Sequence, residues 1–175
     1  MRTINTRNFQ LKSGFTLIEI LVVLTIISLF TGYSLVTYNS FSQQKTLEKE
    51  ASYLVDVLSL ARGKAQASEN SASCSGADEF GGYRVEVNAS NYNFKQCCRD
   101  IVTKAISSCG SNIQSYNFHS SVSKISGAPA VDFYPLTSGA TSTTMRIKHD
   151  SLNKCLDISI TATGIITVGD IPFSC

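Results

Sequence analysis

The stretch Gly14-Phe15-Thr16-Leu17-Ile18-Glu19 decides how this 175-residue chain is organised. It stands between a basic leader, residues 1–13, and a long apolar run. The leader holds no acidic residue, and its basic residues are Arg2, Arg7 and Lys12. Glu19 is the only charged residue from Gly14 until Lys45. A basic start followed by an apolar run is typical of a segment that enters a membrane.

The apolar run extends from Phe15 to about Tyr38. An ordinary secretory signal has an apolar stretch of only about 7–15 residues and then a small-residue cleavage site, which residues 39–42 (Asn-Ser-Phe-Ser) do not offer. At about 1.5 Å per residue, a helix over this run reaches about 36 Å, more than the ~30 Å hydrocarbon core of a bilayer. We therefore expect residues 15–38 to span the membrane once, with the leader in the cytoplasm and everything after the span outside.

Residues 12–24, Lys-Ser-Gly-Phe-Thr-Leu-Ile-Glu-Ile-Leu-Val-Val-Leu, resemble the start of a type IV prepilin or pseudopilin. The resemblance implies that a prepilin peptidase in the membrane cuts the Gly14–Phe15 bond, removes residues 1–14 as a leader peptide and methylates the new amino group of Phe15. It also implies that the helix packs into a filament with other pilin or pseudopilin subunits, and that Glu19 is the acidic residue used in assembly.

The chemistry of two positions agrees with this resemblance. Gly14 has no side chain, so a peptidase can approach the backbone closely. Glu19 would lie about one helical turn into the bilayer, and an unpaired charge is costly there, up to the value of about 2.5–3.5 kcal/mol found at the centre of a membrane helix. Cleavage creates a positive amine at Phe15, and we expect the amine of one subunit to pair with Glu19 of its neighbour. The alternative is a simple membrane anchor in which Glu19 pairs with its own terminus.

Apolar and small residues recur at intervals of three and four beyond the run, which predicts an amphipathic continuation of the helix over residues 39–68. They are Leu47, Ala51, Leu54, Val55, Leu58, Ala61 and Ala65. Proline is absent from residues 15–67, and Gly32 is the one weak point, since glycine costs about 1 kcal/mol in a helix interior. We expect the stripe to pack against a sheet and the polar residues 68–73 to end the helix.

Short alternating runs replace the helical periodicity from residue 69 onward and predict β-strands. Residues 83–87 and 92–95 form a predicted hairpin around a turn at 88–91. Further strands are predicted at 115–119, 130–134, 143–148, 155–160 and 164–168, with turns at 127–129 and 161–164. A long helix followed by an antiparallel sheet makes an α+β fold, with residues 69–175 as one β-rich globular domain.

Four segments of this domain are similar to the end of the GspH/FimT group of minor pseudopilins. They are residues 131–139, 144–147, 156–160 and 164–168. The resemblance implies a minor subunit of a secretion pseudopilus or of a type IV pilus. Some FimT-like members bind DNA during uptake through an arginine-rich tail around the last strand. This chain departs from that pattern, because Asp170 is its only charged residue after Gly164.

The charge balance gives little support to DNA binding. The chain carries 15 basic and 13 acidic residues, and loss of the three basic leader residues leaves 12 against 13. Affinity for nucleic acid depends on neutralised phosphates and on a basic stripe. The candidates for DNA or ligand contacts are Lys124, Arg146, Lys148 and Lys154, which could gather on one edge, with Tyr92 or Tyr134 stacking on bases. The alternative is a solvated sheet face.

Six cysteines lie in the part expected outside the membrane: Cys74, Cys97, Cys98, Cys109, Cys155 and Cys175. An even number in an exported domain predicts disulfides. Cys155 and Cys175 bracket the last predicted hairpin, so we expect a bond between them, and two further bonds in which Cys97 and Cys98 do not join each other. A zinc site and a redox-active Cys97–Cys98 pair are the alternatives, although Cys-x-x-Cys spacing is absent and His119 and His149 are isolated in the sequence.

The sequence contains no nucleophile elbow, phosphate loop or metalloprotease motif, so we predict no enzymatic activity, no cofactor and no metal. The prepilin resemblance implies a minor pilin or pseudopilin of a type IV pilus or type II secretion pseudopilus. It places the chain in the bacterial inner membrane, with its globular domain in the periplasm or in an extracellular pilus. The alternatives are a DNA-binding or ligand-binding subunit, and a membrane-anchored protein outside any filament.

Overall fold

The computed structural model describes residues 14–175 except 70–73, 77, 137–138 and 170–172, and describes only the backbone of 33–37. The leader, part of the predicted turn at 68–73, and Asp170 therefore lie outside the described residues. The chain divides into two compact units, residues 1–39 and 40–175. All of the strands among the described residues lie in the second unit.

Helix α1, Leu17–Gln66, runs through Gly32 and ends two residues before the predicted boundary. Its last turn closes through backbone bonds, from the Ser68 amide to the Ala65 carbonyl and from the Glu69 amide to the Lys64 carbonyl, both 3.0 Å. Ser68 has a φ of 49°, so it occupies the left-handed position that glycine usually takes in this capping motif.

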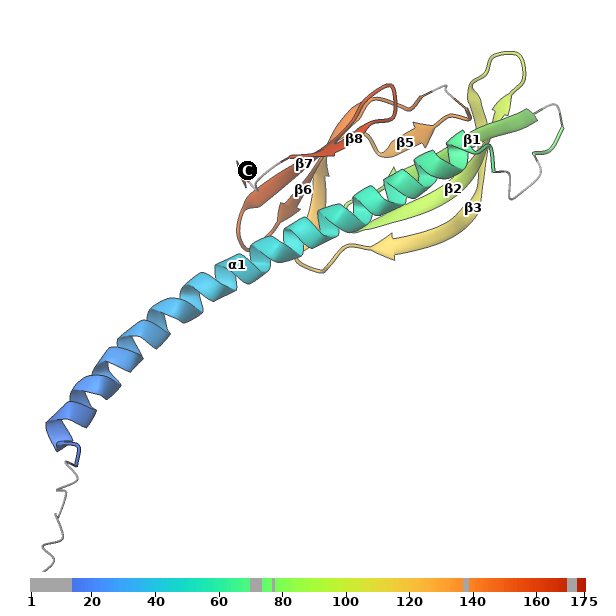
Figure 1. The fold of residues 1–175 in the computed structure, drawn as a ribbon. Helices are drawn as coiled ribbons and strands as arrows, with labels where there is room; N and C mark the ends of the chain where they lie inside the picture. Colours follow the sequence, from blue (N-terminus) through green and yellow to red (C-terminus); the bar gives the residue numbers. More distant parts are fainter. Residues whose placement is uncertain (1–13, 70–73, 77, 137–138, 170–172) are drawn as a thin grey trace, which may run out of the picture. The chain divides into compact units, whose positions relative to one another are not determined.

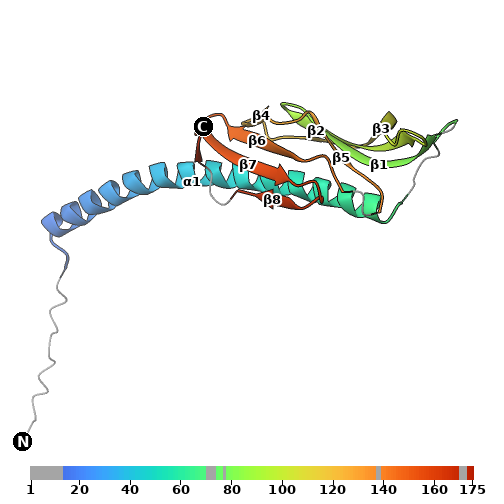
Figure 2. The ribbon, with the colours of Figure 1, turned by 90° about the horizontal axis from the view of Figure 1, so that it is seen from above.

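The described residues after α1 form two antiparallel sheets, which lie alongside the part of α1 that belongs to the second unit (Figures 1 and 2). The first has the order β3-β2-β1-β5, with β1 at Asp78–Val87, β2 at Asn91–Asp100, β3 at Ile106–Asn117 and β5 at Ala130–Phe133. The second has the order β4-β6-β7-β8, with β4 at Val122–Ser126, β6 at Thr143–His149, β7 at Lys154–Ile160 and β8 at Ile166–Val168. The short β9, Phe173–Ser174, also pairs with β7. The predicted α+β fold is confirmed, but with two sheets where one was expected.

The predicted hairpin is confirmed as the centre of β1 and β2, and both strands are longer than expected. A bulge between Phe80 and Gly82 lets β1 continue its pairing back to Asp78. Gly82 has a φ of 111°, and a Cβ there would lie 2.0 Å from the Phe133 carbonyl oxygen. Glycine is therefore required for β5 to approach β1 at this point.

Two strands, β4 and β9, were not predicted, and β3 begins nine residues before its predicted start. Most of β3 is polar and exposed, so it lacks the hydrophobic alternation that reveals a strand in a sequence. It is an edge strand, and its pairing with β2 rather than burial of its side chains holds it in place.

One hydrophobic core joins α1 to both sheets within the second unit. Six of the seven predicted stripe residues are buried, whereas Val55 is only partly buried and the unpredicted Val57 is buried. Tyr83 and Phe94 stack in this core with ring centroids 5.0 Å apart. Full burial of a large apolar side chain contributes about 1.5–3 kcal/mol, so the stripe is a main source of stability for the second unit.

Candidate functional site

Gly14, Phe15 and Thr16 precede α1 in a non-helical conformation and are exposed to solvent. Phe15 exposes 80% of its surface. Exposed, irregular segments are the preferred sites of proteolysis, because the backbone there can enter a peptidase without unfolding an element. The predicted scissile bond thus lies at an accessible position, directly before the helix begins.

Thr16 caps the first turn of α1. Its Oγ1 accepts a hydrogen bond from the Glu19 amide, and its carbonyl accepts one from the Ile20 amide, both 3.3 Å. Thr16 and Glu19 therefore stand at the N-cap and third helical positions, the spacing of a capping box. This Thr-x-x-Glu pattern is present in the sequence, where Glu19 was expected to act in assembly alone, so the capping role of Glu19 was not predicted.

The Glu19 carboxylate is exposed, with neither a hydrogen-bond nor an ion-pair partner among the described residues. A carboxylate in the first turn interacts favourably with the helix dipole, by about 0.3–1 kcal/mol. That interaction leaves the oxygen atoms open to a cation from another molecule. Glu19 thus combines a local role in starting the helix with a free acidic group.

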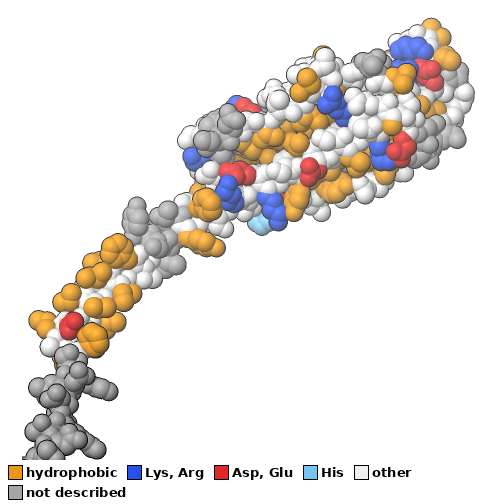
Figure 3. All heavy atoms as spheres, in the orientation of Figure 1, with side chains coloured by type: hydrophobic (Ala, Val, Ile, Leu, Met, Phe, Trp, Pro, Cys, Tyr) orange, Lys and Arg blue, Asp and Glu red, His pale blue; other side chains and the backbone are white. Residues whose placement is uncertain are grey.

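The first unit exposes apolar side chains on all sides of α1. Their exposed fractions run from 48% for Val23 to 83% for Leu17. The set comprises Phe15, Leu17, Ile18, Ile20, Leu21, Val22, Val23, Leu24, Ile26, Ile27, Leu29 and Phe30. Figure 3 shows hydrophobic side chains over most of the visible surface of this segment. Soluble monomers rarely expose a contiguous apolar surface of this kind, so the segment requires a lipid or protein environment.

The hydroxyl groups of this segment bond to its own backbone. Thr25, Ser28 and Thr31 each donate to the carbonyl four residues earlier at 2.8 Å. A hydroxyl satisfied in this way costs little when its surroundings become apolar. Apart from Glu19, the described side chains of α1 up to Thr31 are therefore compatible with an apolar medium.

Across the residues with described side chains, no helix carries an apolar stretch long enough to cross a membrane. The predicted span at 15–38 includes residues 33–37, for which the structure describes only the backbone.

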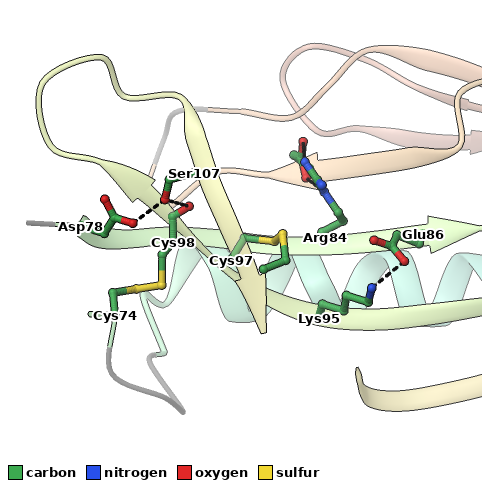
Figure 4. The surroundings of a disulfide bond; sticks show 10 residues. Cys74, Asp78, Arg84, Glu86, Lys95, Cys97, Cys98 and Ser107 are labelled. Atoms are coloured by element: carbon green, nitrogen blue, oxygen red, sulfur yellow. Dashed lines mark hydrogen bonds and ion pairs between the residues drawn. A yellow bond between two sulfur atoms is a disulfide. The ribbon is translucent and has the colours of Figure 1, made fainter. Parts of the chain in front are cut away.

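All six cysteines form disulfides, so the prediction of three bonds is confirmed. Cys155 bonds to Cys175, as expected, and ties β7 to the end of the chain. Cys97 bonds to Cys109 across β2 and β3, whereas Cys98 bonds to Cys74 (Figure 4). Because every cysteine is disulfide-bonded, no free thiol is left to bind zinc, and Cys97 and Cys98 do not form a redox-active pair with each other. The described residues also contain no cluster of three metal-binding side chains.

The four candidate basic residues do not gather on one face. Arg146 and Lys148 alternate with the buried residues of β6 and lie on the face away from the core. Lys124 lies opposite the buried Ile147 and Lys154 opposite the buried His149, so both occupy core-face positions of the second sheet.

The partners of Arg146 and Lys124 lie within the chain. Arg146 donates two hydrogen bonds to Asp157, at 2.7 and 2.8 Å. The Lys124 ammonium donates to the carbonyls of Val87 and Ala128, at 2.8 and 2.6 Å, and its burial lowers its pKa. Tyr92, expected to stack on bases, exposes only 2% of its surface. The expected basic edge is therefore not formed.

The two histidines, isolated in the sequence, share a hydrogen-bonding partner in the structure. The Ser121 hydroxyl lies 2.8 Å from His119 Nδ1 and 3.1 Å from His149 Nε2. His149 is buried, and its Nδ1 has no hydrogen-bond partner. Burial lowers the pKa of His149, the nearby Asp150 raises it and His119 lowers it further. The neutral imidazole is therefore favoured in the folded protein.

Residues 10–35 match the family model described as the prokaryotic N-terminal methylation motif. The match covers the segment whose resemblance to prepilins was predicted, and it confirms that resemblance for this part of the chain. Among solved structures, the chain is similar to the minor pseudopilin EpsH from the type 2 secretion system of Vibrio cholerae. The identity is 16% and the TM-score 0.42, over 70% of this chain and 95% of that chain. None of the curated proteins compared with the chain matches it.

Proposed function

We propose that this chain, which carries the N-terminal methylation motif at residues 10–35, is a minor pilin or pseudopilin. A prepilin peptidase removes residues 1–14 and methylates the amino group of Phe15. The mature helix then joins other pilin or pseudopilin subunits in a type IV pilus or a type II secretion pseudopilus. The role is structural rather than catalytic.

The observation that carries this proposal is the exposed apolar surface from Phe15 to Phe30, which lies within the motif. Its hydroxyl groups are satisfied internally, so it can be buried at low cost. Before assembly this segment anchors the chain in the bacterial inner membrane, with the disulfide-bonded domain in the periplasm. After assembly the same surface packs against other helices. The resemblance of residues 131–139, 144–147, 156–160 and 164–168 to the GspH/FimT group supports a minor subunit.

Glu19 sets the position of each subunit in this proposal. Its carboxylate has no ion-pair or hydrogen-bond partner among the described residues, and cleavage before Phe15 creates the cation that it lacks. Pairing between Glu19 of one subunit and the Phe15 amine of its neighbour removes an unpaired charge from an apolar environment. Such a charge costs about 2.5–3.5 kcal/mol at the centre of a membrane helix.

The test is to purify the protein from its own cells and determine its N-terminus by mass spectrometry. We expect a chain that begins at Phe15 and carries one N-methyl group. Functional material that retains Met1 would exclude the proposal.

The Glu19→Gln variant tests assembly separately. It keeps the size of the side chain and the amide that Thr16 caps, so we expect normal processing. Incorporation into filaments should fall at least about tenfold, the effect of losing about 1.4 kcal/mol of pairing energy. Wild-type incorporation would contradict the role assigned to Glu19.

A further inference from the structure

A groove lies between α1 and the first sheet, within the unit of residues 40–175. Its volume is about 510 Å³. Glu50, Tyr53, Asp56 and Leu60 line it from α1, and Tyr92 and Tyr116 line it from β2 and β3. Ligand-binding pockets typically have volumes of about 300–1,000 Å³, so the groove is large enough to hold a side chain together with its neighbours.

Glu50 is the unusual residue of this groove. It exposes only 8% of its surface, and its carboxylate has neither a hydrogen bond nor an ion pair within the described part of the chain. Its carboxylate oxygens are not fully enclosed, so they reach the open space of the groove and can accept a bond from a bound group. Asp56 adds a second carboxylate at the exposed margin of the same groove.

Three tyrosines surround these acids. Tyr92 and Tyr116 stack with ring centroids 5.2 Å apart, and Tyr53 exposes 47% of its surface. The faces of aromatic rings attract cations, and the Lys49 ammonium already lies 5.3 Å from the centre of the Tyr53 ring.

The pKa of the Tyr92 hydroxyl is sensitive to the burial and the acidic charge of this groove. Burial raises the pKa of Tyr92 to about 12, and the charges of Glu50, Tyr116, Asp56 and Tyr53 contribute in the same direction. Burial opposes a charge of either sign, whereas the negative charges of the Glu50 and Asp56 carboxylates attract a cation. The groove is therefore complementary to a cation.

We propose that this groove binds a lysine or arginine side chain presented by a protein partner, with Glu50 as the acceptor of its ion pair. A polypeptide fits better than a free cation because apolar surface adjoins the acids. Leu60 and Tyr53 are each more than 40% exposed beside the groove, and Val57 lines it. They cover the stem of the basic side chain and an adjacent apolar residue of the partner. The inference does not depend on the function assigned to the N-terminal segment.

The experiment measures binding of two blocked, fluorescein-labelled peptides to the full chain in non-ionic detergent at neutral pH. One peptide has the sequence Ala-Leu-Lys-Leu-Ala, and in the other glutamate replaces lysine. Fluorescence anisotropy should report saturable binding of the lysine peptide and none of the glutamate peptide. Equal binding of both peptides, or binding of neither, would overturn the proposal.

The Glu50→Gln variant removes the charge and keeps the shape of the side chain. We expect it to weaken binding of the lysine peptide at least about tenfold. Glu48→Gln is the matched control, because Glu48 lies on the same helix, pairs with Lys45 and does not line the groove. Its affinity should equal that of the unmodified chain. Equal affinities of the two variants would refute the role of Glu50.

A second variant keeps the proposal testable if Glu50→Gln does not fold. Asp56 is exposed, so Asp56→Asn should leave the fold intact, as thermal unfolding can verify. We expect it to weaken binding of the lysine peptide by a smaller factor, about threefold, because exposed charges are screened by solvent. Unchanged affinity in this folded variant would count against a cation site.

Discussion

Arg84 on β1 holds Asp132 on β5 through two parallel hydrogen bonds, from Nε to Oδ1 at 2.6 Å and from Nη2 to Oδ2 at 3.0 Å. The two residues lie directly opposite each other in the ladder that joins these strands. Asp132 raises the pKa of Arg84 above its usual value, while burial opposes that shift. The strand β5 is only four residues long, so this ion pair adds a side-chain contact to its short ladder with β1 and to the burial of Val131 and Phe133.

The Asp132→Asn variant should therefore be less stable. Paired hydrogen bonds to a charged group are worth about 1.5–3 kcal/mol when well buried, and partial exposure here reduces the expected loss to about 1 kcal/mol. Urea unfolding of the full chain in detergent measures the change. Glu86→Gln, which breaks the neighbouring single contact to Lys95, is the control and should cost less. An equal loss in both variants would contradict a special role of the Arg84 pair.

Removal of the Cys155–Cys175 bond should destabilise the domain and release β9 from β7. The double variant Cys155→Ser/Cys175→Ser avoids an unpaired thiol. The cysteines are 20 residues apart, and closing a loop of this size stabilises a protein by about 3 kcal/mol in the chain-entropy model. Thermal unfolding and amide exchange at Phe173 are the measurements. An unchanged melting temperature together with unchanged exchange would show that β9 holds without the disulfide.

The buried His149 should make the domain less stable in acid. Its pKa is lower in the folded protein, chiefly because of burial, so the unfolded chain binds the proton more readily. Neutral His149 therefore contributes its full share to the free energy of unfolding above the pKa of histidine in the unfolded chain, about 6.5. That share is lost as the pH falls towards the lower pKa that His149 has in the folded protein. Thermal unfolding between about pH 7.5 and pH 5 measures this loss.

The control for this pH effect is a pair of variants. His149→Gln should flatten the dependence of melting temperature on pH, whereas His119→Gln, at an exposed position beside the same Ser121, should retain most of it. Asp150, whose negative charge raises the pKa of His149, is unchanged in both variants. The explanation fails if the two variants respond to acid alike.

Thr16→Ala should loosen the start of α1, because it removes the acceptor of the Glu19 amide. Loss of an N-cap side chain costs about 0.5–2 kcal/mol of helix stability. Amide hydrogen exchange at residues 18–20, in detergent micelles, should be faster in Thr16→Ala and near normal in Thr16→Ser, which keeps a hydroxyl. If Thr16→Ser exchanges as fast as Thr16→Ala, the hydroxyl does not cap the helix.

Most of the fold could be predicted where hydrophobic spacing is regular. The stripe from Leu47 to Ala65 identified the buried face of α1, and alternation identified the centres of β1, β2 and β7. Spacing failed at β3, because an edge strand with a polar face has no core to impose alternation. It also could not show that the strands divide into two sheets, because that depends on pairings between residues far apart in the sequence.

Among the candidate sites, a disulfide within one hairpin could be predicted from the sequence, whereas sites that depend on strand register or on helix packing could not. The pairing of Cys155 with Cys175 followed from their places at the two ends of one hairpin, and the structure confirms it. The basic edge failed because strand register places Lys124 and Arg146 on opposite faces of the second sheet, which their spacing along the chain does not reveal. The acidic groove was not predicted at all, since Glu50 meets Tyr92 only after α1 packs on the first sheet.

The internal bonds of Thr25, Ser28 and Thr31 have a consequence for how copies of this helix fit together. With those hydroxyls occupied, contacts along the apolar surface come from burial and dispersion, which depend weakly on angle. In the proposed filament, neighbouring helices would then slide or rotate past one another at small cost, and bending would not have to break a specific bond between them. There Glu19 would fix the placement of each subunit and the apolar surface would supply mechanical compliance, so the two properties would belong to different parts of one helix.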